Sequence, residues 1–361
     1  MTTVLDAGDA RGTAVPAARQ LVAGGLLPGP RMVTCGPFVG RPPKMWPNTL
    51  LVEDPVTPAV IVQAAIDRGA QAIKLYEGLT ASDIAAIASE ASARGLLVIG
   101  HAPAALDVET AGVPEVQHFF GVPAASSRSG NGSLLQRLAD WHAVNDARLD
   151  VVVEASVTNG IEHTPTLVVT EGVLRAHQQP RPVEKLLPRV YSEVVWHPET
   201  GLPTYRNATP QDIAHTHDSL PIKLDLLGRL HRAGVPLYVG TDVNQPYVVP
   251  GASLQRELQL SADAAIPPAT VMDIATVQAG KQLSIPQLGT VAIRAPADLL
   301  VLDRDPREDI SALDSLRAVV SGGCLLDIAV LRDAVNRQLH HYRRLTVDRA
   351  SILAAGGCSG S

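Results

Sequence analysis

The stretch that decides the fold is Ala70–His101, which reads AQAIKLYEGLTASDIAAIASEASARGLLVIGH. The apolar run AQAIKLY predicts a buried strand, and LLVIG predicts a second one. Between them, Thr80 and Ser82 are candidate N-caps for a helix that runs to Gly95, a suitable C-cap. A strand, a helix and a strand in this order form a unit whose two strands lie parallel.

The same alternation of short apolar runs and helical patterns continues on both sides of this unit. It predicts an α/β protein with a parallel sheet. The expected strands are 3–6, 30–36, 70–76, 96–100, 115–119, 161–169 and 236–242, and the expected helices are 16–24, 58–68, 80–95, 134–145, 149–158, 224–234, 251–264 and 268–282, with a short helix between 101 and 115.

Two segments depart from this alternation. Residues 178–210 are rich in proline and polar residues, with the aromatics Tyr191, Trp196 and Tyr205 interleaved, and we interpret them as a long excursion over one face of the sheet. From Leu288 the pattern changes to short strands with turns (GTVAI, ADLLVLD, LRAVVSGG). A terminal helix is expected over about 327–343, and the glycine-rich tail after it is expected to be disordered.

Composition narrows the class of protein. Hydrophobic residues make up 46% of the 361 residues and aromatics 3%, so we expect a large aliphatic core. The net charge of −6 comes with no basic stripe, so we expect no nucleic-acid partner. No apolar run reaches the roughly 18 residues of a membrane span, and the N-terminus lacks the pattern of a signal peptide. Cys35, Cys324 and Cys358 are far apart, which favours free thiols and a cytoplasmic location, with an upstream signal left open.

Four polar residues follow predicted strands directly or end them: Lys74, His101, His118 and Asp242. In parallel barrels this end of the strands is where active sites are built. Each residue also has an ordinary interpretation, as a solvated lysine, a hydrogen-bonded structural histidine or a turn aspartate. Together they form a plausible set of oxygen and nitrogen ligands.

The chemistry of this set is coherent. Two neutral imidazoles bind zinc or a similar divalent ion. A protonated lysine cannot bind a metal, but a lysine carboxylated by carbon dioxide can, and it can bridge two ions. Such ions lower the pKa of a bound water and polarise a carbonyl, while an aspartate beside the water moves its proton.

Several segments resemble a known family. AIKLYEGLT, VIGHAP, EVQHFFG and GTDVNQPYVVPGASLQREL are similar, in this order, to segments of the amidohydrolase superfamily, in its imidazolonepropionase-related branch, which includes dipeptidases. The opening TTVLDAG resembles the second barrel strand of that branch. The resemblance covers nearly the whole chain and implies a TIM-type (β/α) barrel over residues 1–287 that lacks its first strand. It further implies a partial β-sandwich over 288–325, followed by 326–361 as helix and tail.

The resemblance also implies the roles of individual residues. Lys74 is the carboxylated bridging ligand, His101 and His118 bind one metal, and Asp242 binds the other and acts as general base. Tyr76, two positions after Lys74 on the same strand face, is a candidate for substrate binding. A strand aromatic that caps the barrel is the alternative interpretation of Tyr76. The implied reaction is hydrolysis of an amide or other C–N bond, in a dipeptide or N-acyl amino acid, with one or two divalent ions, zinc expected, and carbon dioxide for the lysine.

One feature of the family pattern is missing. Its first strand ends in a His-x-His pair that binds the first metal, and no such strand precedes Thr3. The pair His215 and His217 falls in or beside a predicted helix, where residues two apart diverge, so we interpret it as solvated, as we do His340 and His341. We therefore expect an N-terminal truncation of a longer active enzyme, poorly soluble or self-associating through unpaired strand edges.

Three alternatives to the two-metal enzyme stay open. The first is a one-metal enzyme that uses Lys74, His101 and His118 with water as the fourth ligand. The second is a barrel without catalysis that binds a small molecule or partner, and the third is an impaired fragment. Metal content per chain, which is two ions, one or none, separates the two-metal enzyme, the one-metal enzyme and the inactive alternatives.

Overall fold

The computed structural model describes residues 1–128, 134–182, 184–199, 201 and 208–342. Its centre is a six-stranded parallel sheet in the order β4-β3-β5-β6-β7-β8. The predicted tail, Cys358 and Tyr205 lie outside the described residues. The strands of the sheet are β3 (Phe38–Gly40), β4 (Thr49–Leu51), β5 (Ala72–Leu75), β6 (Leu97–Gly100), β7 (Glu115–Gln117) and β8 (Glu162–Thr164).

The parallel series extends beyond this sheet on both sides. β1 (Thr3–Asp6) pairs in parallel with β2 (Arg31–Thr34), which leads directly into β3. At the other end, Leu237 forms a parallel bridge with His163 of β8. The predicted strand 236–242 is thus reduced to one bridge in the structure. Among the described residues, β1 and Leu237 have no backbone partner on their other side.

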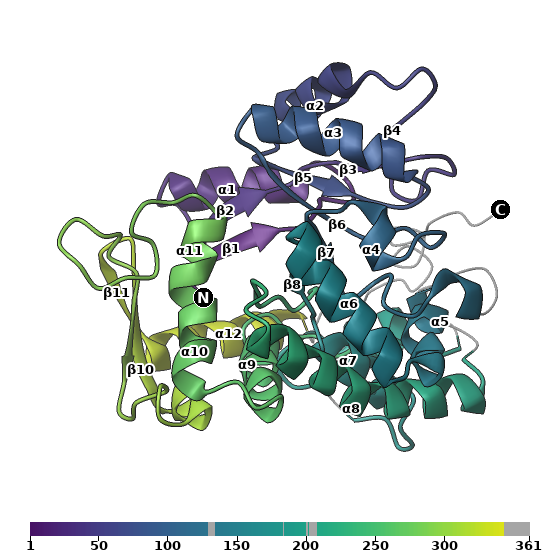
Figure 1. The fold of residues 1–361 in the computed structure, drawn as a ribbon. Helices are drawn as coiled ribbons and strands as arrows, with labels where there is room; N and C mark the ends of the chain where they lie inside the picture. The colour runs from purple at the N-terminus through teal and green to yellow at the C-terminus, as the bar shows by residue number, and fades with distance from the viewer. Residues whose placement is uncertain (129–133, 183, 200, 202–207, 343–361) are drawn as a thin grey trace.

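Helices cover the outer face of the sheet, as Figure 1 shows for α2, α3 and α6. Because strand side chains alternate, Ile73 and Leu75 pack outward into the main aliphatic core, while Lys74 between them points the other way. The helices are α1 (Ala14–Ala23), α2 (Pro58–Asp67), α3 (Ala81–Ala93), α4 (Val108–Ala111), α5 (Leu134–Ala139), α6 (Asp146–Asn159), α7 (Val168–Ala176), α8 (Pro210–Arg232), α9 (Ala252–Asp263), α10 (Pro268–Asp273), α11 (Ala279–Gln282) and α12 (Ile328–Tyr342).

The C-terminal part forms a separate antiparallel sheet in the order β11-β10-β9, with strands β9 (Leu299–Leu302), β10 (Leu316–Ser321) and β11 (Cys324–Asp327). The predicted strand at 289–293 is wrong, because this segment is irregular and pairs with no other described segment. Its apolar residues Val291 and Ile293 are 90% and 91% exposed. No described helix is long and apolar enough to cross a membrane.

One sequence expectation near the sheet also needs correction. The predicted strand 161–169 is shorter, because its second half begins α7 at Val168. Short apolar runs carry no period that separates strand from helix. In the excursion 178–210, residues Tyr191–Val195 form a π-helical turn, and Trp196 packs its ring on Tyr247, at 5.1 Å between centroids.

Candidate active site

Lys74 points into the interior of the strand series and is 2% exposed. It lies on β5 above Ala72, which packs with Cys35 and Ile99 in a small apolar cluster. Its Nζ donates a hydrogen bond to Gln117 Oε1 at the end of β7. Burial lowers the pKa of the Lys74 ammonium to about 8, so the neutral amine is accessible near neutral pH.

His101 directly follows β6 and is held close to β5. Its backbone N–H donates to the Leu75 carbonyl at 3.1 Å. Gly100 makes this approach possible, because a Cβ there would lie 2.6 Å from the Leu75 carbonyl oxygen. His101 Nδ1 lies 2.9 Å from Glu77 Oε1, and burial holds the pKa of the ring well below its usual value. The imidazole is therefore neutral, and Nε2 remains for a ligand.

His118 follows β7 in the left-handed backbone region, with φ of 63°. Its Nδ1 lies 2.6 Å from the hydroxyl of Thr166, so this ring also keeps Nε2 for a ligand. Burial and the neighbouring His101 lower its pKa well below the usual range. The two histidine rings meet edge to face, with 5.1 Å between their centroids.

Asp242 completes the group from the loop after Leu237. Its Oδ2 lies 3.9 Å from Nε2 of His118 and accepts a hydrogen bond from Gln245 Nε2 at 2.8 Å. Burial raises the pKa of the Asp242 carboxyl, and Lys74 opposes that rise. The structure thus brings together the four residues that the sequence singled out, although they come from four different strand ends.

Tyr76 forms part of the wall beside this group. Its ring lies 4.5 Å from the His101 ring and 4.8 Å from the Phe38 ring, and the residue is 6% exposed. Its substrate-binding role stays a prediction. Sequence reasoning missed Glu77, Gln117 and Thr166, which contact the predicted residues. Glu77 and Gln117 are polar and lie near strand ends, so this pattern was a usable signal for them.

The other histidines lie elsewhere. His163 is fully buried on the outer side of β8, and its Nε2 lies 2.9 Å from Ser156 Oγ of α6. Burial lowers the pKa of His163 to about 3. His217 is exposed as expected, but His215 is not simply solvated, because it stacks on His142 at 4.2 Å. His340 and His341 are exposed on α12.

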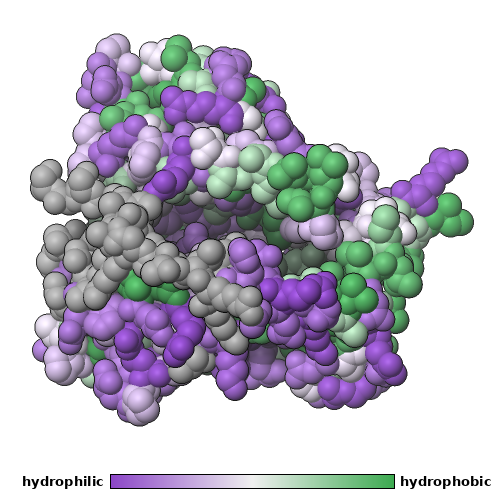
Figure 2. Space-filling view, turned by 180° about the vertical axis from the view of Figure 1, so that it is seen from behind, coloured by the Kyte–Doolittle hydropathy of each residue, from purple (hydrophilic) through white to green (hydrophobic). Residues whose placement is uncertain are grey.

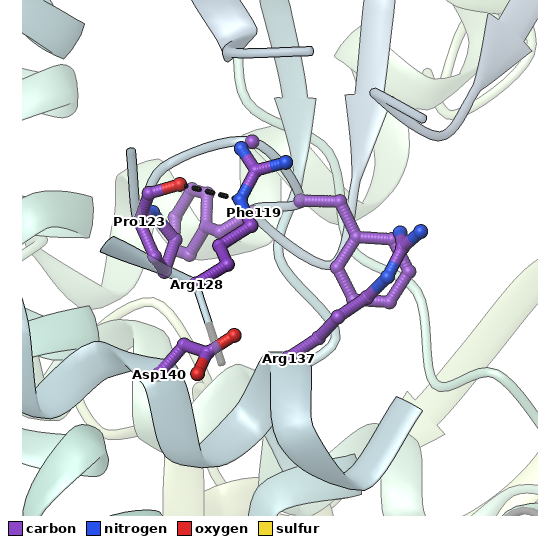
Figure 3. Close-up of a pocket in the computed structure, with 7 residues that line it drawn as sticks. Phe119, Pro123, Arg128, Arg137 and Asp140 are labelled. Atoms are coloured by element: carbon purple, nitrogen blue, oxygen red, sulfur yellow. Dashed lines mark hydrogen bonds between the residues drawn. The ribbon is translucent and has the colours of Figure 1, made fainter. Parts of the chain in front are cut away.

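Figures 2 and 3 show one face of the molecule and one small pocket. The face in Figure 2 is hollowed near its centre, with hydrophilic residues inside the hollow. A small pocket adjoins His118 through the residues that follow it in the chain (Figure 3). It is lined by Phe119, Phe120, Gly121, Pro123, Arg128, Arg137 and Asp140.

Comparisons with known proteins give the family. Residues 1–326 match the sequence model of the amidohydrolase family. The chain belongs to the amidohydrolase family. No protein with a curated description matches this amidohydrolase significantly in sequence.

Solved structures resemble this amidohydrolase along most of their length. An amidohydrolase of bottromycin shares 19% identity at a TM-score of 0.69, with 92% of this chain and 72% of that chain covered. A Xaa-Pro dipeptidase with bound methionine shares 20% identity at a TM-score of 0.60, with 91% of this chain and 75% of that chain covered. A putative prolidase from Bifidobacterium longum shares 21% identity at a TM-score of 0.60, with 94% of this chain and 77% of that chain covered. At these identities the likeness shows the fold alone, which is the TIM-type α/β barrel. Family and fold support hydrolase activity in general.

Members of this family typically use divalent metals, so the donors of the site can be tested for fit. Among the described residues, no three His, Cys, Asp or Glu side chains gather closely enough to hold an ion. The two neutral imidazoles and Asp242 nevertheless present the right donor types, and a carboxylated Lys74 would add an anionic oxygen. In donor chemistry the group fits a divalent ion, with Lys74 as the residue on which the fit depends.

Proposed function

We propose that this amidohydrolase hydrolyses an amide or another C–N bond in a small substrate such as a dipeptide or an N-acyl amino acid. The observation that carries the proposal is the convergence of Lys74, His101, His118 and Asp242, with Asp242 Oδ2 3.9 Å from His118 Nε2. Neutral imidazoles and a desolvated lysine are the protonation states that metal binding and carboxylation require.

Each of these four residues has its own role in the proposed hydrolysis. Nε2 of His101 and of His118, together with a carboxylated Lys74, would hold one divalent ion, zinc being the first candidate, and Asp242 would serve a second one. When bound, such an ion lowers the pKa of water and polarises the carbonyl of the substrate. The Lys74 amine attacks carbon dioxide and releases one proton, which leaves an anionic carbamate. Asp242 accepts a proton from the attacking water and delivers it to the leaving nitrogen, so the C–N bond breaks and an acid and an amine are formed.

The experiment that tests this proposal changes Lys74. Lys74→Ala and Lys74→Arg should both lose metal and hydrolysis of a panel of dipeptides and N-acyl amino acids, because guanidinium stays protonated and cannot be carboxylated. Short carboxylic acids in solution should partly restore Lys74→Ala. Metal per chain is measured by mass spectrometry beside the rates.

The matched control is Lys281→Arg, at an exposed lysine of α11, which should keep both metal and rate. An active Lys74→Arg enzyme would contradict the proposal and make Lys74 a simple structural residue. If the unchanged chain binds no metal and hydrolyses nothing on the panel, the proposal fails and the alternatives of a non-catalytic binding protein and of an impaired fragment remain.

A further inference from the structure

Glu77 is an acidic residue that the proposed function does not use, yet its carboxylate is held by three partners. It lies just beyond β5, the strand that carries Lys74. One oxygen, Oε1, lies 2.9 Å from His101 Nδ1. The other, Oε2, accepts hydrogen bonds from the Ala104 N–H at 3.1 Å and from Arg137 Nη2 at 2.6 Å. The position of the carboxylate is therefore fixed on both of its oxygens.

The backbone of Glu77 is fixed as well. Its carbonyl accepts a hydrogen bond from the Arg41 N–H at 3.0 Å. Gly40 at the end of β3 lies so close that a Cβ there would be 2.9 Å from the same carbonyl oxygen. Both ends of the Glu77 residue are thus tied to the scaffold, so its carboxylate has little freedom to follow a moving histidine.

Arg137, which lies far from Glu77 in the sequence, holds the Glu77 carboxylate in place. It comes from α5 and is 8% exposed. Besides pairing with Glu77, its guanidinium carbon lies 4.4 Å from the centre of the Phe120 ring. That ring packs on His101 at 4.7 Å and on His118 at 5.0 Å. In Figure 3 the Arg137 side chain rises from its helix and points away from Asp140. One arginine thus supports His101 through a carboxylate and both histidines through an aromatic ring.

The contact between Glu77 and His101 decides which ring nitrogen carries the proton. A carboxylate offers acceptors alone, so the nitrogen that faces it must be the N–H donor. Nδ1 of the neutral ring is then protonated, and the lone pair is on Nε2. In metalloproteins a carboxylate behind a histidine ligand fixes the tautomer and the ring orientation in this way.

We propose that Glu77, anchored by Arg137, is a positioning residue that locks His101 in the Nδ1-protonated tautomer and so prepares Nε2 for a divalent ion. The purpose of the lock rests on the proposed function. The lock itself needs no ion, because its three partners are present in the chain alone.

The test measures the tautomer in metal-free protein. Histidine labelled with ¹⁵N is incorporated, metal is removed with a chelator, and two-bond nitrogen–proton correlations assign Nδ1 and Nε2 of His101. The unchanged chain should show protonated Nδ1. Glu77→Leu removes the acceptor and should shift His101 to the Nε2-protonated form. Glu77→Gln keeps the shape and can accept or donate, so it should give a mixture. Glu90→Gln, on the outer helix α3, is the matched control and should change nothing.

A second measurement reports the consequence for metal. Titration with cobalt(II), followed by its visible absorption, should give a dissociation constant about 10–100-fold higher for Glu77→Leu, with a smaller rise for Glu77→Gln. Circular dichroism verifies that each variant is folded. If Glu77→Leu is not folded, the comparison is made with Glu77→Gln, which preserves the packing.

The outcomes separate the two proposals. Protonated Nε2 in the unchanged chain, or a tautomer that both folded variants leave unaltered, overturns the positioning role. The expected tautomers together with no cobalt binding by the unchanged chain overturn the proposed function, while the lock on His101 stands.

Discussion

Lys223 is a buried lysine that should cost the folded state stability near neutral pH. It lies in the middle of α8 and is 2% exposed. Its Nζ donates to Thr170 Oγ1 of α7 at 2.9 Å and lies 5.1 Å from the centre of the Trp141 ring. Burial lowers the pKa of its ammonium from 10.5 to about 7. We predict that Lys223→Met, which keeps the length and removes the charge, stabilises the protein at pH 7.

The magnitude follows from the shift in pKa. The unfolded chain holds the proton up to about pH 10.5, whereas the folded protein releases it near pH 7, so stability rises with pH between these values. The full difference corresponds to about 5 kcal/mol at low pH. Loss of the Thr170 hydrogen bond offsets about 1 kcal/mol, and loss of the contact with Trp141 offsets up to about 2. The net gain at pH 7 should be about 2 kcal/mol, and by pH 10 the variant should instead be about 1–2 kcal/mol less stable than the unchanged chain.

The assay is urea unfolding of both proteins at pH 7, 8, 9 and 10, with Lys281→Met at an exposed position as the control. The free energy of unfolding of Lys223→Met, relative to that of the unchanged chain, should fall by about 3–4 kcal/mol across this range, because the unfolded lysine then loses its proton too. A gap that stays constant with pH would refute the reasoning and show that Lys223 keeps its charge when folded.

Two further predictions concern the site and the surface. Asp242→Asn removes the proton acceptor, so kcat should fall about 10²–10⁴-fold with little change in KM. The control Asp218→Asn, at an exposed position, should keep the rate of the unchanged chain. Normal turnover by Asp242→Asn would place the base elsewhere. We also propose that the chain self-associates through apolar side chains such as Val291 and Ile293, which are 90% and 91% exposed. Changing both to Asp should shift sedimentation toward the monomer, and an unchanged distribution would exclude this surface.

The parts of the site that sequence could predict are those set by local order. Lys74, His101 and His118 each end or follow a short apolar run, and parallel strands bring such ends together whatever the helices between them do. Asp242 was found in the same way, although its strand survives as a single bridge at Leu237. The position of a strand end thus proved more robust than the strand itself.

The supporting contacts were not predictable, because they join segments far apart in sequence. Arg137 lies on a helix, and nothing in its neighbours marks it as a partner of Glu77. The stacking of His215 on His142 depends likewise on how α8 crosses the chain before α6. The apolar residues at the start of α7 were misread for a different reason, since three such residues in a row fit a strand and a buried helix equally well.

The turn after β7 has a consequence for how this protein can change over time. Phe119, with φ of 54°, shares the left-handed backbone of His118 and is fully buried. Glycine at this position would relieve about 1–2 kcal/mol of backbone strain. It would also remove a ring whose loss from a core costs about 3–5 kcal/mol. A single substitution of Phe119 therefore either loses the buried ring or keeps the strained backbone, so this position resists replacement. Descendants of this chain can exchange the groups around His118 more readily than the bend that aims it.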